Sequence, residues 1–181
     1  MPTYNVYMGQ GVTITDLRGN TLSTGAGDES HRVQSCSAVI LVNTVTWKAG
    51  IYHFPSGDIY EGVYAKHSRK VLWDMKREVS PTEAHIVFGK IGVIPTGLDA
   101  ATETAQERAE KLHSFVLKLV PVKTGRVRRR PADTGYVTVT CNAGAVVLGD
   151  QEPYPIVDLQ KKAAGDHGAY KTYGHALPSG A

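Results

Sequence analysis

Long apolar segments and cysteines are both scarce in this chain of 181 residues. No uncharged apolar run approaches the roughly 18 residues of a membrane-spanning helix, and the first residues lack the basic and apolar parts of a secretory signal peptide. We therefore expect no membrane partner, and a cytoplasmic protein or one delivered without a cleaved signal peptide. Two cysteines, Cys36 and Cys141, are too few for a disulfide framework, although the sequence also allows one bridge between them.

Charge of one sign is also scarce, because the net charge is only +3. The exception is a basic row, Arg126, Arg128 and Arg130, whose side chains would share one face of a strand. Such a row most often protects a solvated sheet edge, and its functional alternative is a surface for an acidic partner. Aromatic residues are not interleaved with it, so we expect no nucleic-acid partner.

Patterns typical of cofactor and metal sites are missing as well. The Gly25 to Gly27 segment lacks the spacing and the following helix of a phosphate-binding loop. His31, Cys36 and His53 could supply three zinc ligands, but no CxxC or HxxxH spacing supports them and no fourth ligand suggests itself. We expect neither a metal nor an organic cofactor.

Short β-type segments dominate what is present. Apolar or alternating runs predict strands at 35–42, 47–54, 59–64, 85–88 and 136–141. One helix is predicted over residues 99–119, and Pro121 follows its end. Its apolar residues recur at helical steps and are expected to be buried: Ala105, Ala109, Leu112, Val116 and Leu119.

The order of these segments predicts an α+β fold, namely a mostly antiparallel β-sandwich with one long helix packed on a sheet. We expect a single domain over residues 1–160. Residues 161–181 are rich in Gly, Ala and Lys without periodicity, which predicts a loosely ordered C-terminal tail.

Cys36 and His53 are the most informative pair of residues. A tight loop centred between Thr44 and Val45 would join the strands at 35–42 and 47–54 and set Cys36 directly opposite His53. Directly opposed residues point to the same face, with Cβ atoms about 4.5–5.5 Å apart, which suits a bond between thiol and imidazole. That arrangement is typical of an activated cysteine nucleophile.

Other interpretations of the pair stay open. A free cysteine is usually a small core residue, and a histidine at a strand end is usually a rim residue. A loop with one residue more or fewer would put the two side chains on opposite faces.

The stretch over residues 30–57 resembles a known family. The residues that carry this resemblance are Ser35, Cys36, Ala38 and Val39, followed by the run AGIYHFPSG that contains His53. They are similar to the Cys-His core of the CheD chemoreceptor glutamine deamidases and of the deamidating toxins typified by the cytotoxic necrotizing factors. Ser30 stands where the CheD pattern has a threonine, whereas Gln34 replaces a usual glycine.

The resemblance implies a cysteine-dependent hydrolase that deamidates glutamine side chains of a target protein through a thioester. Cys36 would be the nucleophile, His53 the general base, and Ser30 or a backbone carbonyl the group that orients the imidazole. The alternatives are a Cys-His amidase or peptidase of other specificity, and a non-catalytic binding module that uses the basic row.

Overall fold

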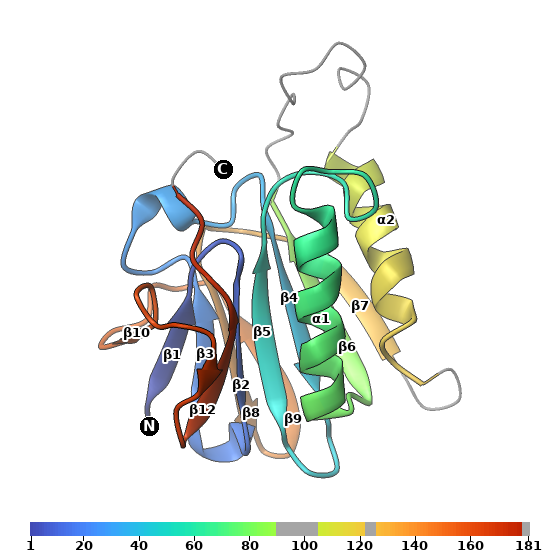
Figure 1. Cartoon of the computed structure of the whole chain (residues 1–181). Coiled ribbons are helices and arrows are strands. Elements are labelled where there is room, and N and C mark those ends of the chain that lie inside the picture. Colours follow the sequence, from blue (N-terminus) through green and yellow to red (C-terminus); the bar gives the residue numbers. More distant parts are fainter. Residues whose placement is uncertain (90–104, 122–125, 179–181) are drawn as a thin grey trace.

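Two β-sheets packed face to face form the body of the protein in a computed structural model, which describes residues 1–89, 105–121 and 126–178 (Figure 1). The smaller sheet has the order β10-β1-β3-β8-β9, with β1 (Thr3–Val6), β3 (Thr21–Thr24), β8 (Val137–Asn142), β9 (Ala145–Gly149) and β10 (Val157–Asp158). The larger has the order β11-β12-β2-β5-β4-β6-β7, with β2 (Gln10–Ile14), β4 (Ser37–Val42), β5 (Ala49–Phe54), β6 (Glu83–Phe88), β7 (Arg126–Pro131), β11 (Gly165–Asp166) and β12 (Tyr170–Gly174).

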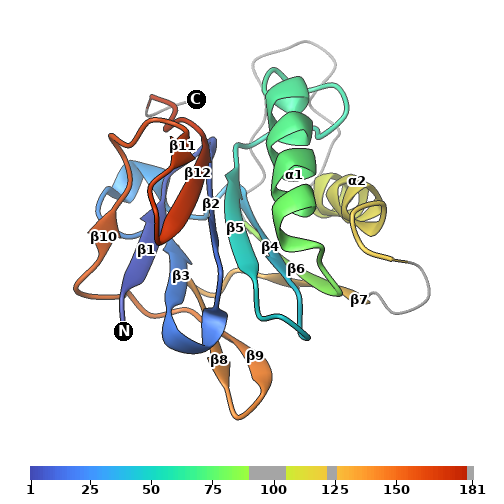
Figure 2. The ribbon, with the colours of Figure 1, turned by 60° about the horizontal axis from the view of Figure 1, so that its bottom comes forward.

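Helices α1 (Ala65–Val79) and α2 (Ala105–Leu117) cover the outer face of the larger sheet, as Figure 2 shows. Helix α1 lies over β2, β4, β5 and β12, whereas α2 lies over β6 and β7. Two short 3-10 helices, η1 (Leu17–Gly19) and η2 (Glu29–His31), connect strands. Most strand pairs are antiparallel, so the predicted α+β sandwich is confirmed.

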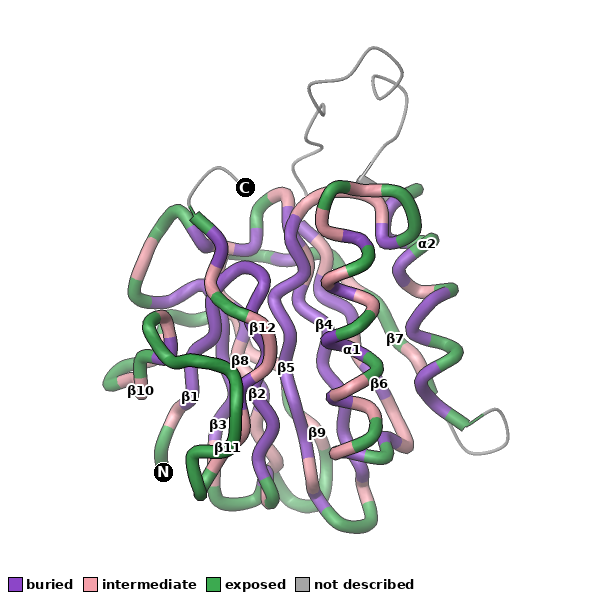
Figure 3. Tube along the Cα trace, in the orientation of Figure 1, coloured by how far each residue is buried: buried purple, intermediate pink, exposed green. Residues whose placement is uncertain are grey.

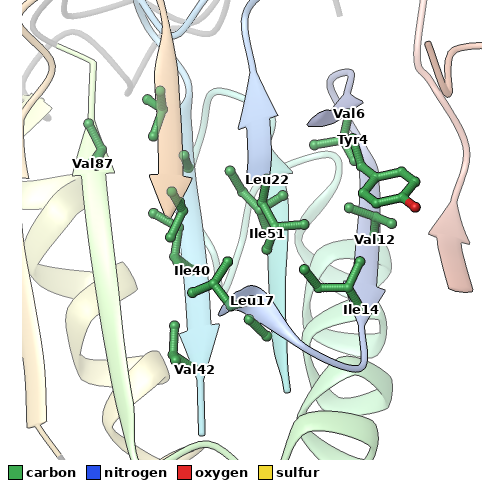
Figure 4. Packing of buried hydrophobic residues seen from close by; sticks show 14 of the residues in the cluster. Tyr4, Val6, Val12, Ile14, Leu17, Leu22, Ile40, Val42, Ile51 and Val87 are labelled. Atoms are coloured by element: carbon green, nitrogen blue, oxygen red, sulfur yellow. The ribbon is translucent and has the colours of Figure 1, made fainter. Parts of the chain in front are cut away.

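The central strands β4 and β5 are buried along almost their whole length (Figure 3). Their apolar side chains alternate between two cores. Ile40 and Ile51 face the smaller sheet and pack near Leu22 (Figure 4), whereas Val39 and Leu41 face the helices. Strands covered on both faces need a nearly continuous apolar sequence. For this reason the apolar runs of β4 and β5 were predicted as strands.

Helix α2 confirms the predicted helical period. Leu112 and Val116 are buried against the larger sheet together with Ala109; α2 ends at Leu117, two residues earlier than predicted, and Leu119 is buried in the turn that follows it. The part of the prediction that covers residues 99–104, together with the side chain of Ala105, lies outside the described residues.

The prediction of a single helix and of a strand at 59–64 is corrected. Residues 59–64 form turns, in which the backbone N–H groups of Tyr60 and Glu61 donate to the Asp58 carboxylate, and they lead directly into α1. Helix α1 buries Leu72 and Met75 against the sheet. Its apolar period was present in the sequence and was missed.

The predicted loose tail is also corrected. Residues 165–174 contain β11 and β12, and β12 pairs with β2 from Tyr170 opposite Ile14 to Gly174 opposite Gln10. Thr172 is buried within this strand. A segment of low hydrophobicity is held here by a backbone ladder, a contribution that composition does not reveal.

None of the helices in the described part combines the length and the apolar composition that crossing a membrane requires.

The packing of α2 can be tested with two leucines of the same helix. Leu112 is 1% exposed and Leu117 is 50% exposed. We expect Leu112→Ala to lower the free energy of unfolding by about 2–5 kcal/mol, because it leaves a cavity, and Leu117→Ala to change it by less than about 1 kcal/mol. Urea denaturation followed by circular dichroism measures both. Equal losses would contradict the assigned orientation of α2.

Candidate functional site

The β4–β5 hairpin has a different register from the predicted one. Ala38, not Cys36, lies opposite His53, and Ser37 lies opposite Phe54. The prediction that Cys36 and His53 are directly opposed is therefore wrong by two positions.

The connecting loop explains the shift. The backbone N–H of Asn43 donates to the Lys48 carbonyl at 2.9 Å, so Asn43 still belongs to the paired strands, and Trp47 adopts a left-handed conformation with φ of 65°. The Asn43 side-chain oxygen accepts from the backbone N–H groups of Val45 and Thr46. An asparagine commonly starts such a turn, and this signal places the loop centre one residue later than predicted.

Cys36 lies one residue before β4 and continues its ladder with β6. The backbone N–H of Gly89 donates to the Cys36 carbonyl at 2.8 Å. Ser37, the first residue of β4, lies on the side of the sheet that carries Phe54 and the helices, whereas Ala38 and His53 lie on the side of the smaller sheet. Only glycine fits at position 89, because a Cβ there would overlap the Gln34 carbonyl.

The turn between β1 and β2 brings the thiol and the imidazole to one end of the sandwich. The Met8 Sδ atom lies 3.3 Å from the Cys36 Sγ atom, and the next residue, Gly9, donates its backbone N–H to the His53 carbonyl at 2.9 Å. The backbone N–H of Met8 donates to His31 Nδ1 at 3.0 Å. Cys36 and His53 thus contact the same turn, but no hydrogen bond joins them within the described residues.

The hydroxyl that holds His53 belongs to Thr24 of β3, on the smaller sheet. The Thr24 Oγ1 atom lies 2.6 Å from His53 Nδ1 and donates its proton to the Val6 carbonyl at 2.7 Å. A hydroxyl has one proton to donate, so Thr24 must accept from His53, whose proton is then on Nδ1. The lone pair is left on Nε2, which is buried and has no hydrogen-bond partner in the described part of the chain.

Burial keeps both groups uncharged. It lowers the pKa of His53 to about 3, with a smaller contribution from nearby His31. Burial also raises the pKa of the Cys36 thiol, and hydrogen bonds from the Ser56 backbone and the Ser35 side chain oppose this rise. At neutral pH the site therefore holds a neutral imidazole and a protonated thiol.

The prediction that Ser30 orients the imidazole is corrected. The Ser30 hydroxyl donates to the Asp28 carboxylate at 2.7 Å on the exposed helix η2. Thr24 occupies the expected role instead. No local sequence pattern could identify it, because the contact joins strands of two different sheets.

A small pocket adjoins the cysteine. Ser35, Ser37, Phe54, Phe88 and Gly89 form most of its wall, and its volume is about 10 Å³, which admits about one water molecule. Cys36 is buried and is not among the residues that line this pocket, so a glutamine side chain could reach the thiol only if the segments that cover it part.

Neither cysteine is in a disulfide, so the alternative of a bridge between Cys36 and Cys141 does not hold. Among the described residues, no three His, Cys, Asp or Glu side chains gather closely enough to hold a metal ion.

The buried imidazole predicts a specific loss of stability in acid. Its pKa is lower in the folded chain than the value near 6.5 of an unfolded one, so between pH 6.5 and about 3 the unfolded state binds the extra proton. We expect the free energy of unfolding to fall there by up to about 1.4 kcal/mol per pH unit from His53 alone. In the variant His53→Gln, the free energy of unfolding should fall less steeply with decreasing pH.

Urea denaturation at a series of pH values measures these slopes. His175→Gln is the matched control, because His175 is exposed and its replacement should leave the slope unchanged. An unchanged slope in His53→Gln would mean that the imidazole is not kept neutral by burial.

No protein-family model matches the chain, and no curated protein matches it either. Functional inference therefore rests on the residues of the site itself.

Proposed function

We propose that the protein is a cysteine-dependent amidohydrolase that deamidates glutamine side chains of a target protein. Cys36 is the nucleophile, His53 the general base, and Thr24 the residue that positions His53. The resemblance of residues 30–57 to glutamine deamidases suggests the substrate, and the geometry around His53 supports the chemistry. The expected place of action is the cytosol, of the producing cell or of a target cell.

One observation carries the proposal: the free lone pair of His53 Nε2. A core histidine that served packing alone would be expected to use both ring nitrogens, because a buried polar atom without a partner costs about 1–3 kcal/mol. Here Thr24 fixes the tautomer through Nδ1, and Nε2 has no partner among the described residues. A neutral imidazole with a free ring nitrogen can accept a proton from a thiol that approaches it, which supports the role of a base.

In the proposed reaction, His53 Nε2 takes the proton of the Cys36 thiol and the thiolate attacks the carboxamide carbon. The Ser56 backbone N–H, which already interacts with the sulfur, and the Cys36 N–H are the donors that we assign to the developing oxyanion. The protonated His53 gives its proton to the departing ammonia, which leaves a thioester. Water then attacks the thioester, releases glutamate and restores the thiol.

The closed site must open for this reaction. A pKa of about 3 makes His53 a weak base, since proton transfer is most efficient when the pKa is near the working pH. Burial is the main cause of that low value, so parting the segments that cover Cys36 and His53 to admit a glutamine also raises the pKa toward its ordinary range. Substrate entry thus activates the base.

The positioning role of Thr24 is tested against Ser30. We expect Thr24→Val to lower the deamidation rate at least ~10-fold, because the imidazole loses its fixed tautomer, and Ser30→Ala to leave it almost unchanged. Cys36→Ser and His53→Ala should abolish activity. Mass spectrometry of glutamine-bearing proteins, together with ammonia release, gives the rates at equal folded fractions.

Retained activity in Cys36→Ser would overturn the nucleophile assignment. Peptide cleavage in place of deamidation would identify a peptidase that uses the same groups.

A second test needs no substrate. Iodoacetamide carries a carboxamide and alkylates thiolates, so its rate at Cys36 reports activation by His53. We expect the rate to fall several-fold in His53→Ala, whereas Cys141, which is half-exposed, should react at the same rate in both proteins and serves as internal reference.

If Cys36 were only a core residue, His53→Ala would loosen its surroundings and the rate would rise or stay equal. That result, with no modification of any protein by the wild type, would favour a binding module.

A further inference from the structure

The open edge of the larger sheet carries arginines that the fold does not use. Strand β7 is the last strand of this sheet, and in the described residues no strand pairs with its outer side (Figure 1). Arg130 lies opposite Val87 of β6, which belongs to the core between the sheets. Strand alternation then puts Arg126, Arg128 and Arg130 on the side that faces the smaller sheet.

Arg129 shows the contrast. It points to the helix side, where its guanidinium lies 3.9 Å from the Glu110 carboxylate of α2. Within the described ranges the three arginines of the other side form no ion pair, and the Nε atom of Arg130 is buried without a hydrogen-bond partner. A buried donor of this kind is costly unless an acceptor binds it.

Arg128 and Arg130 line a cavity of about 330 Å³ between the edges of the two sheets, and Arg129 also contributes to its lining. Arg128, Arg130 and His85 lie on one wall, and Val146 and Leu148 of β9 lie on the other. His85 Nε2 is already within 2.6 Å of the Glu83 carboxylate, so the guanidinium groups are the free donors. The volume lies within the range of ligand pockets, about 300–1,000 Å³.

We propose that the β7 edge and this cavity bind an extended acidic peptide segment of a protein partner. The segment adds to β7 as a further strand and carries Asp or Glu at alternate positions. Its backbone pairs with the open side of β7. Its alternate side chains, about 6.6–6.8 Å apart, match the spacing of the three arginines.

The cavity favours a peptide over other anions. Its apolar wall of Val146 and Leu148 accommodates the methylene groups of a glutamate or a neighbouring apolar side chain. No Phe, Tyr or Trp is among the described residues that line it, so bases of a nucleic acid have no stacking partner. This site is separate from Cys36 and does not depend on the proposed deamidase activity.

Fluorescence anisotropy with the full chain tests the proposal. The probe is a short labelled peptide that alternates Glu with Thr and Val, compared with versions that carry Gln or Lys in place of Glu. We expect the Glu peptide to bind, the Gln peptide to bind at least roughly tenfold more weakly, and the Lys peptide not to bind. A Glu peptide with N-methylated backbone should also lose affinity, because it cannot form the ladder.

Variants locate the site. Arg128→Ala combined with Arg130→Ala should weaken binding of the Glu peptide by roughly tenfold or more. The control combines Lys161→Ala with Lys162→Ala, which removes the same charge from exposed positions elsewhere and should change affinity less than about twofold. Thermal melting by circular dichroism checks that each variant is folded.

Equal losses in the two double variants, or equal binding of the Glu and Gln peptides by the wild type, would overturn the proposal. The comparison of the Glu and Gln peptides on the wild type tests the proposal even if the arginine variant does not fold. Tighter binding of single-stranded oligothymidylate than of the Glu peptide would identify a nucleic-acid surface instead. Cys36 alkylation is measured separately, so none of these failures bears on the deamidase.

Discussion

The rest of the structure depends on the burial of β4 and β5 from both sides. Helices cover one face of this strand pair and the smaller sheet covers the other, so almost every side chain on it must be apolar. His53 is the exception, because it is a fully buried polar residue near the end of β5. A polar ring can be kept there only if it is neutral and hydrogen-bonded; burial keeps it neutral, and the hydrogen bond that His53 Nδ1 donates to Thr24 joins the two sheets.

This constraint explains why the candidate site contains so few polar groups. One side chain fixes the tautomer, one ring nitrogen is left free, and the thiol lies against Met8. The burial that organises these groups also lowers the pKa of the imidazole and raises that of the thiol. In the proposed deamidase, the closed site would be inactive, and the cysteine would stay protected until a substrate opens it.

Two edges of the sandwich, β7 of the larger sheet and β9 of the smaller, make a second, different environment. Strands β7 and β9 end their respective sheets, and the space between them is lined by cationic and apolar side chains together. An arginine row protects a sheet edge from aggregation through its charge. The same row offers an acidic strand both backbone pairing and charge complementarity, so protection and recognition use the same residues.

The sequence by itself determined the elements whose signal is local. Three features could be predicted from it: the apolar runs of β4 and β5, the helical period of α2 and the strand of alternating arginines. Each leaves a pattern in the sequence, because side-chain burial on a strand or helix follows a fixed period. The α+β class followed from the order of these segments. Helix α1 could have been predicted in the same way from the helical spacing of apolar residues such as Leu72 and Met75. Its omission was an error of interpretation.

Only the tertiary structure decided what depends on distant contacts. The hairpin register was set by the Asn43 side chain and by the left-handed Trp47, so Ala38 took the place opposite His53. Strand β12 exists because β2 offers it an edge. Thr24 replaced Ser30 as the partner of His53 because two sheets meet there, and a contact between sheets leaves no spacing in the sequence from which it could be predicted.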